Sequence, residues 1–167
     1  MTRLSVNLNK IALIRNSRGS NYPDLIQVAK DCERFGAQGI TVHPRPDERH
    51  CKFSDLPLLK EACTTEFNIE GYPNRHFLEE VIKVKPHQCT LVPDDPNQIT
   101  SDHGWDTIKH KSFLQEVIQE LKQHDIRVSL FIDADKKLIE GAAAVNADRI
   151  EYYTGPYAKN YSKNPEN

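Results

Sequence analysis

Short runs of β-branched and apolar residues alternate along this chain with longer segments in which apolar residues recur about every 3.6 positions. This alternation constrains the fold, because it is typical of βαβ units, in which helices connect parallel strands. We predict strands at residues 4–8, 39–43, 66–70, 88–93, 127–132 and 149–153. We predict helices at residues 24–35, 77–84, 112–124 and 136–145, among about five in all. The polar residues from Lys159 to the end follow neither pattern, and we expect them to fray.

The six predicted strands are compatible with two parallel α/β architectures. A flavodoxin-like open sheet needs five strands and fits 167 residues, whereas a closed eight-stranded barrel usually needs about 250 residues. The strand ends favour the barrel, because polar side chains occur at five of them and a barrel collects its site from strand ends all round its mouth. Those side chains include Asn7, His43, Glu70, Asp133 and Glu151. We therefore predict an α/β fold of the TIM-type (β/α)8 barrel class, with residues 1–167 forming a single barrel domain of about six βα units.

Composition excludes several classes of protein. The formal net charge of -2 gives no strong field to attract nucleic acid or an acidic membrane. No apolar run approaches the roughly 18 to 20 residues of a membrane span, and the start of the chain has no apolar signal-peptide core. The four cysteines are scattered, with no CxxC pair, which is typical of reduced thiols. We expect a cytoplasmic protein whose partners are small molecules.

Two residues at predicted strand ends can transfer protons. Glu70 shares a strand face with Asn68, so its carboxylate is expected to point into the barrel, where burial raises a carboxyl pKa. A solvated acid at the strand end is the alternative interpretation of Glu70. His43 ends an otherwise apolar strand, and its imidazole can transfer protons near neutral pH. A purely structural histidine is the alternative interpretation of His43.

Basic residues cluster in the segments that follow the first two predicted strands. They are Arg15 and Arg18 in the first segment, and Arg45, Arg49 and His50 in the second. Arginine offers bidentate hydrogen bonds to phosphate, and the glycine in the first segment allows close backbone approach to an oxyanion. Either segment could instead be an exposed charged loop. Two basic loops at one end of a barrel favour small substrates that carry phosphate.

Other catalytic chemistries lack their sequence motifs. The spacing of His43, His50 and Glu70 does not fit a HExxH zinc motif, so we expect no metal site. No GK[ST] phosphate loop and no G-x-S-x-G nucleophile turn is present. A Schiff-base aldolase would need a lysine inside a predicted strand, and none of the six strands has one in its interior.

Several strings of residues taken together are distinctive. They are Val6-Asn7, Ile11-Ala12, residues 15–19, residues 39–50, Phe67-Asn68-Ile69-Glu70, residues 85–88, Leu91-Val92-Pro93 and residues 128–133. In these strings, from residue 3 to about residue 160, the chain resembles the pyridoxine 5'-phosphate synthase family. The resemblance implies a (β/α)8 barrel with extra helices that assembles into homo-oligomers, namely octamers.

The resemblance also implies a reaction and its residues. The reaction condenses 1-deoxy-D-xylulose 5-phosphate with 3-amino-2-oxopropyl phosphate to pyridoxine 5'-phosphate, releasing phosphate and water, in vitamin B6 biosynthesis and without a metal or organic cofactor. His43 and Glu70 would transfer protons, and Glu151 would stabilise a transition state. The substrate-binding residues implied are Asn7 and Arg18 for the aminoketone phosphate, and Arg45, His50 and Thr100 for the deoxyxylulose phosphate.

This chain departs from the family pattern in two respects. Many members have Asp-His where this chain has Asn9-Lys10, which changes the contacts available to deoxyxylulose phosphate. Members are also longer, so we expect the chain to be incomplete at its C-terminal end, without the last two βα units and their proton-donating histidine. Strands one and six would then have open edges. A non-catalytic phosphosugar-binding fragment is accordingly the alternative function, and another barrel-type phosphosugar isomerase or aldolase is the third.

Overall fold

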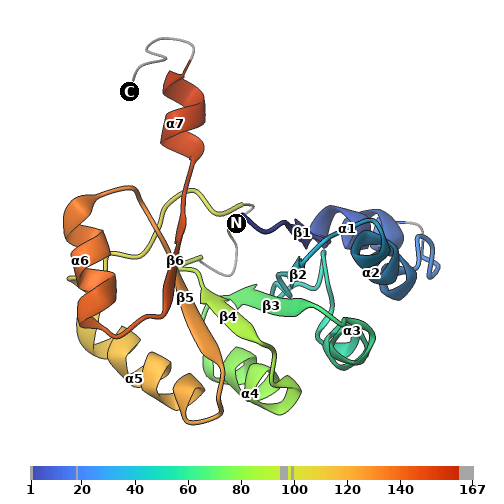
Figure 1. Cartoon of the computed structure of the whole chain (residues 1–167), viewed down its shortest axis with the longest axis horizontal. Helices are drawn as coiled ribbons and strands as arrows, with labels where there is room; N and C mark the ends of the chain where they lie inside the picture. Colours follow the sequence, from blue (N-terminus) through green and yellow to red (C-terminus); the bar gives the residue numbers. More distant parts are fainter. Residues whose placement is uncertain (1, 18, 95–97, 99, 162–167) are drawn as a thin grey trace.

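The predicted strands form one parallel sheet in the computed structural model, which describes residues 2–17, 19–94, 98 and 100–161. The strands are β1 (Ser5–Asn7), β2 (Gly39–Val42), β3 (Glu66–Gly71), β4 (Gln88–Leu91), β5 (Arg127–Ile132) and β6 (Arg149–Tyr152). They pair in chain order from β1 to β6, and Figure 1 shows the sheet curling. Within the described residues, β1 and β6 each have one neighbouring strand. The fold is a curled half-barrel of the predicted TIM-type (β/α)8 class.

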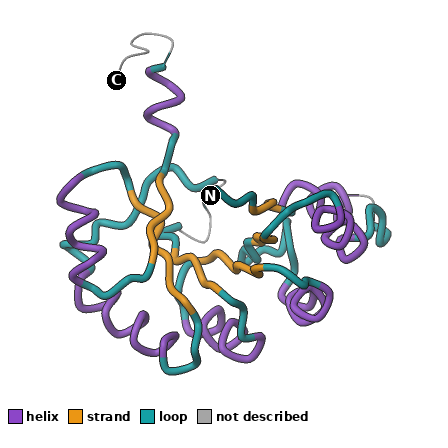
Figure 2. Tube along the Cα trace, in the orientation of Figure 1, coloured by secondary structure: helices purple, strands orange, loops and turns teal. Residues whose placement is uncertain are grey.

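Helices cover the outer side of the curled sheet, as Figure 2 shows. They are α1 (Asn9–Ser17), α2 (Leu25–Arg34), α3 (Leu56–Ala62), α4 (Arg75–Val84), α5 (Lys111–Lys122), α6 (Lys136–Ala144) and α7 (Gly155–Asn160), with a short 3-10 helix, η1 (Phe53–Asp55). Helix α7 is the exception, because it extends away from the body beyond β6 (Figure 1). None of these described helices is long and apolar enough to cross a membrane.

Helix α1 corrects one prediction, because its last turn occupies residues 15–17, which the sequence pattern places in a phosphate-binding loop. The helix starts immediately after β1. Its first N–H group, on Asn9, donates to the side-chain oxygen of Asn7 at 2.9 Å. This bond satisfies a donor that the helix itself leaves unpaired. Among the described residues of this segment, only those from Gly19 onward remain available as a loop.

Helices α3 and α7 are also missing from the sequence-based prediction. Helix α3 has seven residues and α7 has six, which is too short for a 3.6-residue period to be recognised. Because α7 reaches Asn160, the expectation that the tail frays from Lys159 is wrong for these two residues. Residues 162–167 lie outside the described part of the chain.

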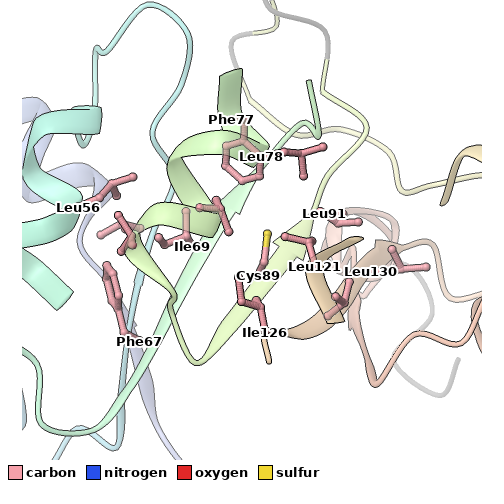
Figure 3. Packing of buried hydrophobic residues seen from close by; sticks show 14 of the residues in the cluster. Leu56, Phe67, Ile69, Phe77, Leu78, Cys89, Leu91, Leu121, Ile126 and Leu130 are labelled. Atoms are coloured by element: carbon pink, nitrogen blue, oxygen red, sulfur yellow. The ribbon is translucent and has the colours of Figure 1, made fainter. Parts of the chain in front are cut away.

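The hydrophobic core lies between the outer face of the sheet and helices α1 to α6. Alternate strand residues face this layer, and they include Ile40, Val42, Phe67, Ile69, Cys89, Leu91, Val128, Leu130 and Ile132, all without exposed surface. Figure 3 shows several of them packed with Phe77 and Leu78 of α4 and Leu121 of α5. Since successive strand residues point to opposite faces, the other alternate residues must line the inner face. Those residues are mostly polar, and they form the site.

Candidate functional site

A cavity of about 760 Å³ lies on the inner face of the sheet. Its walls come from all six strands and from the segments that precede β1 and β2. Most of its lining is polar, and the residues include Arg3, Ser5, Asn7, Gln38, Thr41, Glu66, Asn68, Glu70, Gln88, Ser129, Arg149 and Glu151. A volume of this size is within the usual range for small-molecule sites.

Ion pairs close the end of the cavity where the strands begin. The Glu66 carboxylate pairs with Arg127, and Nη1 of Arg149 lies 3.2 Å from Oε1 of Glu66. Both arginines also donate to the side-chain oxygen of Gln88, at 2.9 Å from Arg127 and 3.2 Å from Arg149. Both arginines are thus bonded to the single Glu66 carboxylate and to Gln88, and this network forms the floor of the cavity.

A layer of hydroxyl and amide groups lies next to this network, further along the strands. The hydroxyls of Ser5 and Thr41 are 2.9 Å apart, and Asn68 donates to Thr41 at 3.3 Å. Thr90 donates to the carbonyl oxygen of the Asn68 side chain at 3.1 Å. Asn68 is thereby held by strands on both sides, which keeps its neighbour on the same face, Glu70, directed into the cavity.

Glu70 lies near the carboxyl end of β3 with its side chain 13% exposed. Burial raises the pKa of its carboxyl group well above the ordinary value, and the nearby carboxylates of Glu151 and Asp94 raise the pKa further. The Arg45 guanidinium acts in the opposite direction and does not compensate for these effects. Glu70 therefore holds its proton to higher pH than a solvated glutamate.

His43 follows β2 directly, and its imidazole Nδ1 lies 3.9 Å from Oε2 of Glu70. Burial lowers the pKa of His43 from 6.5 to about 3, and the nearby positive charges, Arg45 first, contribute to the decrease. Its backbone N–H donates to the side-chain oxygen of Asn9 at 2.8 Å. At neutral pH the pair is consequently a neutral imidazole beside a carboxyl group with a raised pKa, which together offer a proton acceptor and a proton donor.

Glu151 and Asn7 line the same cavity as Glu70. Glu151 is half-buried in β6, and burial raises the pKa of its carboxyl group. Asn7 ends β1, and its oxygen is occupied by the N–H of Asn9, which leaves the amide nitrogen as the group available to a ligand. Three of the predicted site residues are therefore brought together from strands that are far apart in the chain.

Arg45 does not line this cavity. It is 5% exposed, and its Nη2 lies 2.7 Å from the carboxylate of Asp94, itself 3% exposed. A smaller cavity of about 20 Å³ lies beside the pair, with His43 also in its wall. The guanidinium thus lines this smaller cavity together with His43 and is already paired with an anion.

His50 is half-buried in the segment after β2, and its Nδ1 has no hydrogen-bond partner among the described residues. Burial lowers the pKa of His50, with Arg49, Arg45 and Lys10 contributing positive charge. Thr100 is exposed, and its carbonyl oxygen accepts a bond from Gln98 at 2.8 Å. Arg18 lies outside the described residues.

Arg15 corrects the interpretation of the first basic segment. The sequence offers it as a phosphate ligand, but it is buried and makes two bonds of 2.8 Å to the carboxylate of Asp55. It also donates to the side-chain oxygen of Asn16. The Asn16 amide nitrogen in turn donates to the carbonyl oxygens of residues 48, 49 and 50 at 3.0, 3.0 and 2.7 Å. Arg15 and Asn16 therefore hold the segment that carries His50.

Sequence reasoning missed Asp94, Asn16 and the ion pairs at the base of the cavity. Asp94 had a usable signal, because it follows β4 by three residues and polar residues after parallel strands belong to the site end of such folds. The role of Asn16 depends on contacts with residues more than thirty positions away and had no local signal. Among the described residues, no group of three histidine, cysteine or acidic side chains could hold a metal ion.

Comparison with known proteins places the chain in a family. The family described as "Pyridoxal phosphate biosynthesis protein PdxJ" matches residues 4–167. A "Pyridoxine 5'-phosphate synthase" from Phocaeicola vulgatus is 60% identical over 166 residues, which are 99% of this chain and 70% of that protein. The proteins of the same name from Cytophaga hutchinsonii and Christiangramia forsetii are 60% and 56% identical, and each is covered over 70% of its length.

Solved structures show the fold alone. A mandelate oxidase variant with (S)-mandelic acid aligns with a TM-score of 0.60 at 9% identity, over 89% of this chain and 48% of that chain. Another complex of the same variant, with a C4a-OH-FMN adduct, aligns with a TM-score of 0.62 at 9% identity. This chain therefore spans about half the length of these structures.

Proposed function

This chain belongs to the PdxJ family of pyridoxal phosphate biosynthesis proteins, and we propose on that premise that it is a pyridoxine 5'-phosphate synthase. The proposed reaction joins 1-deoxy-D-xylulose 5-phosphate to 3-amino-2-oxopropyl phosphate, forms pyridoxine 5'-phosphate, and releases phosphate and water. His43 and Glu70 transfer protons, and Glu151 stabilises a transition state. No metal or organic cofactor takes part in this proposal.

The observation that carries the proposal is the pairing of His43 with Glu70 beside the large cavity. Imine formation, enolisation and ring closure each move a proton, so the site needs a group that can accept one and a group that can supply one. The neutral imidazole of His43 is the acceptor, and the carboxyl group of Glu70 is the donor, 3.9 Å apart. Glu151 lines the same cavity from β6, where its carboxylate can stabilise developing positive charge.

Substrate binding is proposed at the end of the sheet where the strands terminate. Asn7, with Arg18, binds the aminoketone phosphate, and Arg45, His50 and Thr100 bind the deoxyxylulose phosphate. The supporting observation is the positive charge around His43 and His50, to which Arg45 and Arg49 contribute at both residues. Two phosphate groups on the substrates would supply binding energy for positioning the reacting carbons.

The test combines both substrates with the purified chain and measures pyridoxine 5'-phosphate by mass spectrometry. We expect Glu70→Gln to lower turnover by about 10²- to 10⁴-fold, because the amide cannot donate the carboxyl proton. The matched control is Glu79→Gln, which changes an exposed glutamate of α4 paired with Arg75 and leaves turnover unchanged. Unchanged turnover in Glu70→Gln would remove Glu70 from the proposed mechanism.

A second candidate function is binding of phosphosugars without catalysis. It is favoured by the polar lining of the large cavity, which can bind a ligand whether or not a reaction follows. Isothermal titration calorimetry with 1-deoxy-D-xylulose 5-phosphate separates the two functions. Binding without product formation would support the binding protein and exclude the synthase for this chain.

We also propose that the chain forms homo-oligomers in the cytoplasm. Oligomerisation is supported by exposed apolar side chains around α1, since Leu13, Ile14 and Tyr22 are 37%, 50% and 76% exposed. A reducing compartment is supported by the four free cysteines. Sedimentation velocity on the purified chain tests the first proposal, with a monomer at micromolar concentration as the contradicting result.

A further inference from the structure

A buried ion pair joins the segment after β2 to the segment after β4. Nη2 of Arg45 lies 2.7 Å from Oδ2 of Asp94, and the two side chains are 6% and 3% exposed. Taking both charges out of water is costly unless each finds well-placed partners. A pair this deeply buried therefore needs further hydrogen bonds, and residues 98 and 101 provide them.

Those further hydrogen bonds involve the segment that carries Thr100. The Ser101 hydroxyl donates to the same oxygen of Asp94 at 2.6 Å. Nη1 of Arg45 donates to the carbonyl oxygen of Gln98 at 3.1 Å. The side chain of Gln98 reaches the carbonyl of Thr100 at 2.8 Å. Asp94 thus connects Arg45 with Ser101, the residue that follows Thr100, while Arg45 itself bonds Gln98.

Two buried polar atoms of this pair have no hydrogen-bond partner among the described residues. They are Nε of Arg45 and Oδ1 of Asp94. A buried polar atom without a partner costs free energy, so such atoms usually mark a place where a ligand or water completes the bonding. Both residues line the 20 Å³ cavity whose wall also includes His43. The pair therefore has unused hydrogen-bonding capacity next to the proposed proton acceptor.

We infer that Asp94 is a positioning residue that holds Arg45 and Ser101 in one arrangement, so that Arg45 and Thr100 together form the binding site for the phosphorylated ketose. This inference rests on the proposed function for the identity of the ligand. Asp94 does not contact the reacting atoms in this proposal. It acts by fixing the orientation of a guanidinium whose planar donors must match a phosphate group.

In the alternative role, Asp94 competes with the phosphate group of the substrate for Arg45, and this role predicts the opposite change in affinity. If Asp94 only neutralises Arg45, removing its charge frees the guanidinium and strengthens phosphate binding. If Asp94 positions Arg45, the same change releases both the guanidinium and Ser101, and phosphate binding weakens. The sign of the change in affinity therefore distinguishes positioning from competition.

The experiment measures binding of each substrate to the full chain by calorimetry. We expect Asp94→Asn to weaken binding of 1-deoxy-D-xylulose 5-phosphate by at least tenfold and to leave binding of 3-amino-2-oxopropyl phosphate within twofold. Asp94→Glu, which keeps the charge, should recover part of the loss. Ser101→Ala removes only the hydroxyl partner and should weaken ketose binding about threefold. This milder variant carries the test if Asp94→Asn does not fold.

The matched control is Asp148→Asn. Asp148 also pairs with a cation, Lys122 at 2.8 Å, and accepts a backbone hydrogen bond, but it lies just before β6 at the opposite end of the sheet. This variant should bind both substrates as the original chain does. Equal or tighter ketose binding by Asp94→Asn, or an equal loss for both substrates, would overturn the inference.

Amide hydrogen exchange provides a readout that does not depend on the ligand. We expect exchange at residues 100–104 to be faster in Asp94→Asn than in Asp148→Asn, because Ser101 loses its partner. If the original chain binds neither substrate, the proposed function fails while this exchange measurement still decides whether Asp94 positions the segment. Identical exchange in the two variants would show that it does not.

Discussion

Replacing His43 with glutamine should change how the stability of this protein depends on pH. Burial lowers the pKa of His43 from 6.5 to about 3, so the unfolded chain binds a proton between these pH values that the folded chain does not. The stability associated with the neutral imidazole is complete above about pH 6.5 and is lost as the pH falls towards 3. The glutamine side chain does not take up a proton in this pH range, so the variant lacks this contribution at every pH.

The magnitude follows from the difference between the two pKa values. From 6.5 to about 3 is about 3.5 pH units, and at 1.36 kcal/mol per unit the full effect is about 5 kcal/mol. At pH 4.5, which is 2 units below 6.5, the loss is about 3 kcal/mol. For a domain of this length, each kcal/mol lowers the Tm by about 2 to 4 °C, so the loss corresponds to roughly 6 to 12 °C.

The assay is thermal and urea unfolding followed by circular dichroism at pH 7.5, 6.0 and 4.5. Each protein is compared with its own value at pH 7.5, which removes the constant cost of the substitution. We expect the original chain to lose about 3 kcal/mol more than His43→Gln on going to pH 4.5. His76→Gln, which changes an exposed histidine of α4, should follow the original chain. Parallel pH profiles for the original chain and His43→Gln would refute the argument that His43 is buried and neutral.

Two further predictions concern buried charges. Glu70→Gln should be more stable than the original chain at pH 8 and equally stable at pH 4, because a raised carboxyl pKa makes folding less favourable as the pH rises from the unfolded pKa through the folded one. Thermal melts at both pH values test this, and a lower Tm for the variant at pH 8 would contradict it. Asp55→Asn should lower the free energy of unfolding by about 3 to 5 kcal/mol, because it leaves the buried Arg15 without its charged partner. Urea unfolding measures this change, and a loss below about 1 kcal/mol would mean that Arg15 is not buried as a charge.

The strands and the longer helices could be predicted from the sequence because their signals are local. In β3 the alternation of Phe67 and Ile69 with Asn68 and Glu70 predicts which residues face the helices and which face the cavity, and the structure confirms it. The spacing of Leu114, Val117, Ile118 and Leu121 likewise predicts the buried face of α5. Helices α1 and α3 were not predictable in this way, since one depends on a side-chain cap and the other is too short to show a period.

The partners of the arginines could not be predicted from the sequence. Arg15 and Arg45 look alike in the chain, each lying in a basic segment that follows a strand. Arg15 pairs with Asp55, 40 residues away, and Arg45 pairs with Asp94, 49 residues away. No local pattern connects residues at such separations, because only the curling of the sheet brings the segments after the strands together.

The residue order by itself determined the parallel α/β architecture, the inner and outer faces of the strands, and the identity of the acid–base candidates. Tertiary structure alone decided their protonation and their availability. The pKa of His43 is lowered and that of Glu70 is raised because packing removes both from water, and desolvation depends on every neighbour in space. The same packing brings Arg15 to Asp55. An ion pair requires two charges within about 4 Å of each other, and the two residues come that close only in the folded chain.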